Sequence, residues 1–339
     1  MSNFNRKPDF KQMLKVLDRQ IPDRDVLFEL FMNMDVYERA IGKFAFSNWM
    51  DLNRALCQSY AALGYDYATV TGSSFSFPES DDFERAMTYS LNDTTMISDR
   101  KSFDEYPWPD AKDSDYSMLK DIEADMPAGM KLAVMGPAGV LEAVIKLVGY
   151  DTLCLMLYDD EALLADIFEQ VGIQLLEYYR ISAAYDSVGM LISNDDWGFN
   201  QQTMFSPEMM RKYLFPWHKE IVKIGHAAGK PVMLHSCGNF SQILDDLYDM
   251  GFDARHSYED NIMPVEEAYE LLSDKMAVLG GIDMDFLCRA SHEEIKERSR
   301  KMLARGREKG GYALGSGNSI PVYCPVDNYL AMLSVVDED

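Results

Sequence analysis

Short apolar runs alternate with amphipathic stretches along the chain, and this alternation predicts a parallel sheet covered by helices. Phe10, Met13 and Leu17 recur at helical spacing, which predicts an N-terminal helix over residues 1–20. Buried strands are predicted at residues 26–31, 67–71, 132–135, 188–192, 231–235, 252–257, 277–280 and 312–314. Eight strands, each followed by a helical stretch, indicate an α/β (β/α)8 TIM barrel that forms one domain over residues 1–339.

Residues 73–126 do not fit this repeat. They are rich in Asp, Ser and Pro, and aromatic residues such as Trp108 are interspersed among them. Long ordered insertions often act as lids or binding loops. We therefore expect a long loop insertion over the barrel mouth.

Composition excludes several functional classes. Hydrophobic residues make up 47% of the chain, enough for a sizeable core, but no apolar run approaches the ~20 residues of a membrane helix. The net charge of -24 repels phosphate backbones and anionic lipids, so we expect neither nucleic-acid nor membrane binding. The N-terminus is polar and lacks a signal peptide, which predicts a cytoplasmic protein. Five irregularly spaced cysteines make a disulfide framework improbable.

Active sites of such barrels lie at the C-terminal ends of the strands. Polar residues gather at these ends: Glu29 after the first strand, then 194–198, 235–238, 256–260, 280–283 and 315–318. Among them we expect Asp283, Ser316 and Asn318 to contact a substrate.

The sequence His235-Ser236-Cys237 carries the most specific chemistry. Residues i and i+2 of a strand face the same side, so both side chains should point into the barrel mouth. Imidazole and thiolate are common zinc ligands, and a catalytic zinc site has three protein ligands and an open position. The alternative is a half-buried histidine beside an inert cysteine.

Other candidates each have two interpretations. Asp195 and Asp196 suit a cation ligand, a substrate-orienting group or a base, or else a helix cap and a solvated loop. Trp197 suits stacking on a flat ligand or packing at the rim. His256 suits a second acid–base group or a histidine without chemistry, and Glu29 is a further candidate catalytic carboxylate.

Residues 234–239, Leu-His-Ser-Cys-Gly-Asn, resemble the zinc motif of cobalamin-dependent methyltransferases in the uroporphyrinogen decarboxylase superfamily. The resemblance covers most of the chain. It includes residues 21–24, 195–198, 205–209, 280–283 and 321–328. It implies a zinc ion and a cobalamin-carrying (corrinoid) partner protein, and related barrels often form homodimers.

Two departures from the family pattern matter. True decarboxylases carry an Arg-Gln-Ala-Gly-Arg stretch after the first strand, whereas residues 31–37 here contain no arginine. The methyltransferases complete their zinc site with a cysteine where this chain has Asn318, and decarboxylases typically have histidine there. Cys324 is then the candidate third metal ligand, with Glu29 or Asp196 as oxygen alternatives. A metal-free protein is the remaining possibility.

The resemblance and its departures imply three candidate functions. The first is a zinc-assisted, corrinoid-dependent methyltransferase that moves a methyl group between a corrinoid protein and a small thiol or other small molecule. The second is a decarboxylase like uroporphyrinogen decarboxylase that acts on a smaller or different substrate, in which Asp195 or Asp196 stabilises a protonated intermediate. The third is a non-catalytic binding barrel, which the departure at Asn318 suggests.

Overall fold

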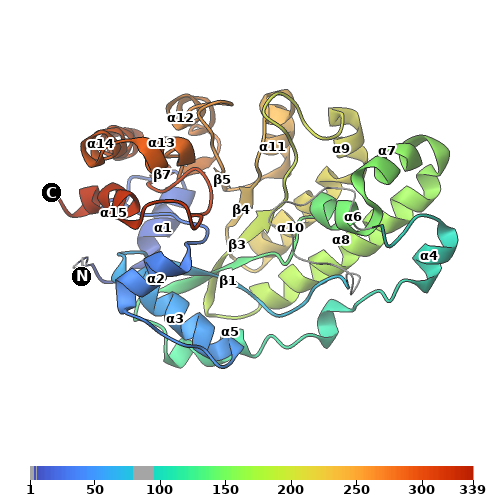
Figure 1. Ribbon diagram of the computed structural model, residues 1–339, viewed down its shortest axis with the longest axis horizontal. Coiled ribbons are helices and arrows are strands. Elements are labelled where there is room, and N and C mark those ends of the chain that lie inside the picture. Colours follow the sequence, from blue (N-terminus) through green and yellow to red (C-terminus); the bar gives the residue numbers. More distant parts are fainter. Residues whose placement is uncertain (1–3, 5, 79–94, 339) are drawn as a thin grey trace.

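The computed structural model describes residues 4, 6–78 and 95–338. Its centre is one curled sheet of seven parallel strands, which lie side by side in the order of the sequence (Figure 1). The strands are β1 Tyr67–Thr71, β2 Lys131–Met135, β3 Val188–Asn194, β4 Val232–His235, β5 Ala254–His256, β6 Ala277–Leu279 and β7 Tyr312–Ala313. Seven of the expected strands are therefore confirmed, with small differences at their ends.

The first expected strand, over residues 26–31, is wrong in its extent. It is reduced to a single parallel bridge between Leu27 and Leu314 beyond β7, with the amide of Phe28 donating to the carbonyl of Leu314 at 2.8 Å. Toward β1 the link is made by a side chain: the Tyr67 hydroxyl accepts from the amide of Glu29 and donates to its carbonyl, both at 2.7 Å. The seven-stranded sheet thus curls toward closure through this segment.

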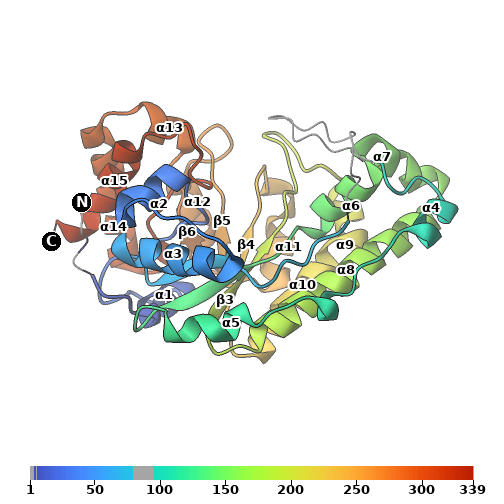
Figure 2. The same cartoon turned by 60° about the horizontal axis from the view of Figure 1, so that its bottom comes forward.

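Helices surround the sheet and connect its strands (Figures 1 and 2). They are α1 Phe10–Leu17, α2 Met34–Ile41, α3 Trp49–Ala62, α4 Arg100–Glu105, α5 Met118–Asp121, α6 Val140–Val148, α7 Tyr150–Asp159, α8 Glu161–Ala183, α9 Pro207–Tyr213, α10 Phe215–Ala227, α11 Leu244–Met250, α12 Val265–Leu272, α13 Met284–Arg289, α14 His292–Lys309 and α15 Val326–Ser334. Short 3-10 turns lie at η1 Ala111–Asp113, η2 Ile122–Ala124, η3 Ser241–Ile243 and η4 Val335–Asp337. The expected N-terminal helix corresponds to α1.

Local sequence signals explain where several helices begin. Ser206 caps α9 and Pro207 occupies its first position, where a missing amide proton costs nothing. Ser291 and Glu294 form a reciprocal capping box at the start of α14. Among the described residues, none of these helices combines the length and apolar character needed to cross a bilayer.

Part of the expected insertion runs along an outer helix. Residues 79–94 lie outside the described part of the chain, so only the remainder of the 73–126 segment is placed. From α4 to α5 it follows the outer side of α8 (Figure 2). Arg100 pairs with Asp166 at 2.7 Å, and the ring of Tyr116 lies 5.7 Å from that of Tyr178. This part therefore covers α8, and the lid over the barrel mouth stays a prediction for the segment as a whole.

Candidate metal and active site

The C-terminal ends of β3, β4 and β5 lie level with one another. In the sheet register, Asn194 is opposite His235, and His235 is opposite His256. The residues that follow these positions therefore leave the sheet at the same rim, which is where parallel barrels carry their chemistry.

Asp196, His235 and Cys237 meet at this rim. One carboxylate oxygen, one ring nitrogen and the sulfur all lie within 4.8 Å of one another, close enough to hold a metal ion. The amide of Cys237 donates to Oδ1 of Asp196 at 2.9 Å, which ties the loop after β4 to the loop after β3. Oxygen, nitrogen and sulfur are all zinc ligands, and three protein ligands match a catalytic zinc site with one open position.

Two side chains point hydrogen atoms at the Cys237 sulfur. The Ser257 hydroxyl donates to it at 3.3 Å, and the Asn318 amide donates at 3.4 Å. Ser257 has φ of 88°, a left-handed backbone that is unusual for a residue other than glycine and that is often found at functional sites. Burial, and then the Asp196 carboxylate, raise the pKa of the Cys237 thiol to about 12. A cation is the natural counterpart of a thiolate in this position.

A pair of hydrogen-bonded histidines determines which nitrogen of His235 is unprotonated. Nε2 of His256 lies 3.1 Å from the carbonyl oxygen of Ser316, and a carbonyl only accepts, so that nitrogen carries the proton. Burial holds the pKa of His256 well below its usual value, so its Nδ1 is unprotonated and accepts. Nδ1 of His235, 2.9 Å away, must therefore be the donor. This leaves Nε2 of His235 with the lone pair that a metal ligand needs.

Glu29 is connected to the histidine pair through Ser316. Its carboxylate accepts from the Ser316 hydroxyl at 2.9 Å, and Ser316 is the residue whose carbonyl fixes His256. Glu29 is fully buried, and this burial raises its pKa to about 8. The structure thus connects Glu29, Ser316, His256 and His235 in series, with Glu29 outside the metal-ligand group.

Asp195 points away from that group. Its carboxylate accepts from the amides of Leu141 and Glu142 at 2.9 and 3.0 Å, at the start of α6. Nε2 of His218 lies 3.0 Å from the same carboxylate. A Cβ atom on Gly139 would lie 2.1 Å from Oδ1 of Asp195, so this approach requires glycine. All these contacts match a helix cap.

Two further candidates from the sequence lie apart from the group. Trp197 is 2% exposed, and its ring lies 4.9 Å from that of His218 and 5.4 Å from that of Phe215. Cys324 is also buried, and its thiol pKa is raised first by burial and then by the neighbouring Cys288. Asp196 rather than Cys324 joins His235 and Cys237.

A cavity of about 1310 Å³ opens next to this group. Asn318 belongs to both, because it lines the cavity and contacts the sulfur of Cys237. Asp283, a predicted substrate contact, also lines the cavity, and its carboxylate caps α13 by accepting from the amide of Phe286 at 2.9 Å. The cavity therefore gives a small molecule room beside the candidate metal ligands.

Three residues near the group were not predicted from the sequence as site residues. Ser257 follows the end of β5 and its position was a signal, but a serine there has many ordinary roles. The buried guanidinium of Arg255 donates to the carbonyls of Ser257 and Ser236, at 2.5 and 2.9 Å, although charged residues are rarely expected inside a sheet. Burial, then Asp195 and Asp196, raise the pKa of Glu142 to about 7, and its position within a helix gave no signal.

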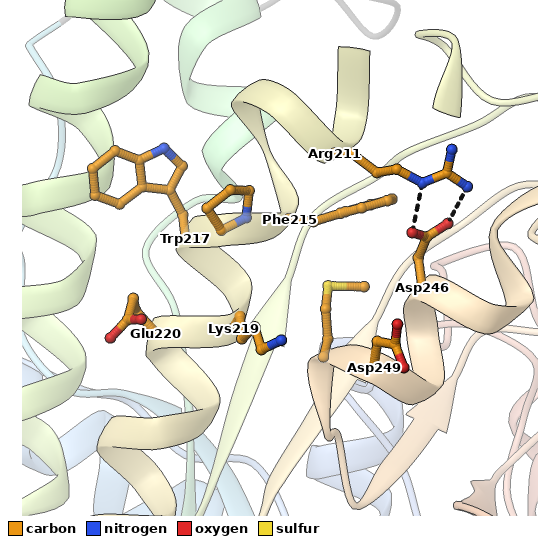
Figure 3. A pocket seen from close by; sticks show the side chains of 9 residues that line it. Arg211, Phe215, Trp217, Lys219, Glu220, Asp246 and Asp249 are labelled. Carbon is orange, nitrogen blue, oxygen red and sulfur yellow. Dashed lines mark hydrogen bonds and ion pairs between the residues drawn. The ribbon is translucent and has the colours of Figure 1, made fainter. Parts of the chain in front are cut away.

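A smaller cavity of about 390 Å³ lies among the outer helices α9, α10 and α11. Figure 3 shows Arg211 bound through two hydrogen bonds, of 2.7 and 2.8 Å, to Asp246 at its edge. Phe215 and Met250 supply its apolar wall. None of its lining residues belongs to the metal-ligand group or to the larger cavity, so we assign the chemistry to the larger one.

The chain is similar to methyltransferases of two Methanosarcina species. Over 136 residues the chain is 26% identical to the methylcobamide:CoM methyltransferase MtaA of Methanosarcina barkeri, and equally to MtaA of its strain Fusaro. These matches cover 40% of this chain and only 38% of each relative. The solved structure of a methyltransferase from Methanosarcina mazei shares the fold, with a TM-score of 0.70 at 15% identity over 97% of this chain and 98% of that one.

The family assignment rests on a longer match. The model of the uroporphyrinogen decarboxylase (URO-D) family matches residues 116–338, which is more than half of the chain. These residues include β3, β4 and β5 and the metal-ligand group at their ends. The resemblance to the superfamily and its methyltransferase branch is therefore confirmed, and the chain belongs to the uroporphyrinogen decarboxylase (URO-D) family.

Proposed function

We propose that this protein is a corrinoid-dependent methyltransferase, which transfers a methyl group between a corrinoid on a separate protein and a small thiol. The observation that carries the proposal is the group formed by Asp196, His235 and Cys237 at the C-terminal rim of the sheet. The similarity to methylcobamide:CoM methyltransferases supports the reaction class.

The same three residues are the proposed ligands of a zinc ion. Zinc bound there would act as a Lewis acid that lowers the pKa of a substrate thiol, so that the thiolate is present at neutral pH. Neighbouring residues of the chain orient these ligands and stabilise their charge. The His235–His256 hydrogen bond fixes the ring, and the donors Ser257 and Asn318 stabilise negative charge on Cys237.

The proposed transfer is a direct displacement. The sulfur of the substrate attacks the methyl carbon, a carbon–sulfur bond forms, and the carbon–cobalt bond breaks with its electron pair remaining on cobalt. The cavity beside Asn318 provides the space in which the thiol approaches the methyl group. The corrinoid protein would dock over this opening.

Metal content tests the ligand set most directly. We expect purified protein to contain close to one zinc per chain by elemental analysis, and His235→Ala and Cys237→Ala to lose it. Two matched controls keep the metal: His226→Ala, since His226 is paired with Asp253 on the surface, and Cys154→Ala, since Cys154 lies on α7. Asp196→Ala should weaken metal retention, while Cys324→Ala should leave it unchanged.

Methyl transfer is then measured from methylcobalamin to a thiol. The two ligand variants should be inactive, and the two controls should match the wild type. Full activity of both His235→Ala and Cys237→Ala would overturn the proposal. Wild-type protein that takes up no zinc from a buffered solution would overturn the metal assignment.

A further inference from the structure

The large cavity beside the metal-ligand group has an unusual charge. Its lining contains five carboxylates and one guanidinium, together with the aromatic rings of Phe286 and Tyr323. The acidic members are Glu259, Asp260, Asp283, Asp285 and Glu294, and the basic member is Arg289. The lining is therefore strongly negative at the place where the substrate of the proposed function would enter.

Some of these carboxylates already form ion pairs or accept backbone hydrogen bonds. Asp260 pairs with Arg298 through contacts of 2.7 Å, and Asp285 pairs with the cavity's own Arg289 at 2.7 Å. Asp283 accepts hydrogen bonds from the backbone amides of Phe286, in α13, and of Asp260. Among the lining residues that the structure describes, the single guanidinium already pairs with Asp285, so carboxylates are in excess around a substrate.

Glu259 is different. Within the part of the chain that the structure describes, no hydrogen bond or ion pair to its carboxylate is found. Its pKa is raised, first by partial burial and then by repulsion from Asp283 and Asp196. Glu259 thus lines the same cavity as Asp283 and has no positive partner there. A bound cation would relieve this repulsion.

The spacing of the carboxylates favours an organic cation over a second metal ion. Across the described ranges, the group formed by Asp196, His235 and Cys237 is the one place where three such side chains bring ligand atoms within 4.8 Å of one another. The cavity carboxylates are spread more widely around a volume of about 1310 Å³. Aromatic rings such as Tyr323, which is 74% exposed, also suit an ammonium group, since cations bind to ring faces.

We propose that the small-molecule substrate of this cavity carries an ammonium group next to its reacting sulfur, and that Glu259 is the residue that selects the positive charge. The proposal rests on the function proposed above and deepens it. An anionic thiol would meet five carboxylates against one guanidinium in the same cavity, so its binding is disfavoured.

Charge preference can be measured without catalysis. Metal-free protein is titrated with 2-(methylthio)ethylamine and with 2-(methylthio)ethanesulfonate, which differ only in the charged group, and dissociation constants are obtained by NMR. We expect the amine to bind at least about tenfold more tightly, and the difference to shrink as salt is raised. Equal binding, tighter binding of the sulfonate, or no binding of the amine would overturn the inference.

A matched pair of variants tests the role of Glu259. Glu259→Gln should reduce the preference for the amine to within about threefold of the sulfonate. Asp274→Asn makes the same change in charge on an exposed residue paired with Lys309, outside the cavity, and should keep the wild-type preference. An unchanged preference for the amine in Glu259→Gln would show that Glu259 does not select the positive charge.

Activity separates this inference from the proposed function. Methyl transfer from methylcobalamin is compared for 2-aminoethanethiol, 2-mercaptoethanol and 2-mercaptoethanesulfonate at equal thiolate concentration. The expected order of kcat/KM follows that sequence, with the amine fastest. Transfer to the sulfonate at the highest rate would overturn the inference and leave the methyltransferase function standing. Absence of transfer to every thiol would count against the function itself, whatever the charge preference of the metal-free protein.

Discussion

The Nδ1 atoms of His235 and His256 lie 2.9 Å apart, and the carbonyl of Ser316 fixes the second ring in turn. Since a carbonyl can only accept, the direction of both hydrogen bonds is determined. Gly280 leaves room for this arrangement, because a Cβ atom there would lie 2.3 Å from the oxygen of Ser316. The orientation of a candidate ligand is thus set by residues from four different strand ends.

Removing the second histidine should weaken metal binding without removing a ligand. In His256→Ala, the ring of His235 loses the acceptor that fixes its orientation and tautomer. We expect the dissociation constant for zinc to rise by about 10–100-fold. It is measured by competition with a chromophoric chelator, and His226→Ala serves as the control. An affinity within twofold of the wild type would show that the histidine pair does not support the site.

Arg255 should contribute to stability through the two loops that it joins. Its guanidinium donates to the carbonyls of Ser236 and Ser257 and lies against the rings of Phe240 and Tyr258, at 4.0 and 5.0 Å. In Arg255→Met these buried carbonyls lose their donors, and we expect the free energy of unfolding to fall by about 2–4 kcal/mol. Urea unfolding measures the change.

The control for this variant is Arg39→Met. Arg39 is exposed and paired with Asp327, and such surface pairs contribute about 0–1 kcal/mol. A similar loss in both variants would contradict a special role for Arg255.

Glu29 should make stability depend on pH. Burial raises its pKa in the folded protein to about 8, above the value of about 4.3 in an unfolded chain. Between these two values the folded state binds more protons than the unfolded state, so the stability contributed by this group falls as pH rises, by at most about 1.4 kcal/mol per pH unit. Below the lower value and above the upper value its contribution is constant.

Glu29→Gln isolates this effect. We expect the difference in unfolding free energy between the variant and the wild type to increase in favour of the variant from pH 5 to pH 8. Urea midpoints at a series of pH values provide the measurement. A difference that stays flat, or that changes in the opposite direction, would mean that Glu29 is ionised throughout this range.

Asp195 and Asp196, although adjacent, should respond differently to substitution. Asp195→Ala removes the acceptor for two amides of α6 and the partner of His218, and we expect a loss of about 2–4 kcal/mol in stability with metal content preserved. Asp160→Ala, which removes an ordinary cap from α8, should cost about 1 kcal/mol. Loss of metal from folded Asp195→Ala would place this residue in the site after all.

Much of the sheet followed from the sequence because its strands are buried on both faces. The apolar runs at 67–71, 188–192 and 277–280 have few interpretations other than interior strands. The run at 26–31 is also largely apolar, but it carries only one bridge, to Leu314, and contacts β1 through the side chain of Tyr67. A pattern of apolar residues predicts which segments are buried. It does not predict whether the backbone of a segment pairs with a neighbouring strand.

The site was predictable in part for a similar reason. His235 and Cys237 share one strand end, so their proximity is a local property of two residues. The identity of the third member depends on how separate loops approach, and the amide of Cys237 selects Asp196 at 2.9 Å. Cys324 was a reasonable chemical candidate, but its position beside Cys288 is fixed by tertiary packing that no spacing encodes.

Residues 27–29 contact residues 314–316, and this long separation in sequence has a consequence for folding. Leu27 bridges Leu314, and the carboxylate of Glu29 meets the hydroxyl of Ser316, 287 positions along the chain. Arg39 of α2 likewise donates a hydrogen bond to Asp327 of α15 at 2.8 Å. Figure 1 shows these two helices near each other. A chain growing on the ribosome has its N-terminal 30 residues free long before their partners emerge, and contacts of such long range form slowly. The contacts that bring the sheet toward closure, and with them the hydrogen bonds that join Ser316, His256 and His235, therefore form late in folding, after residues 312–316 have been made.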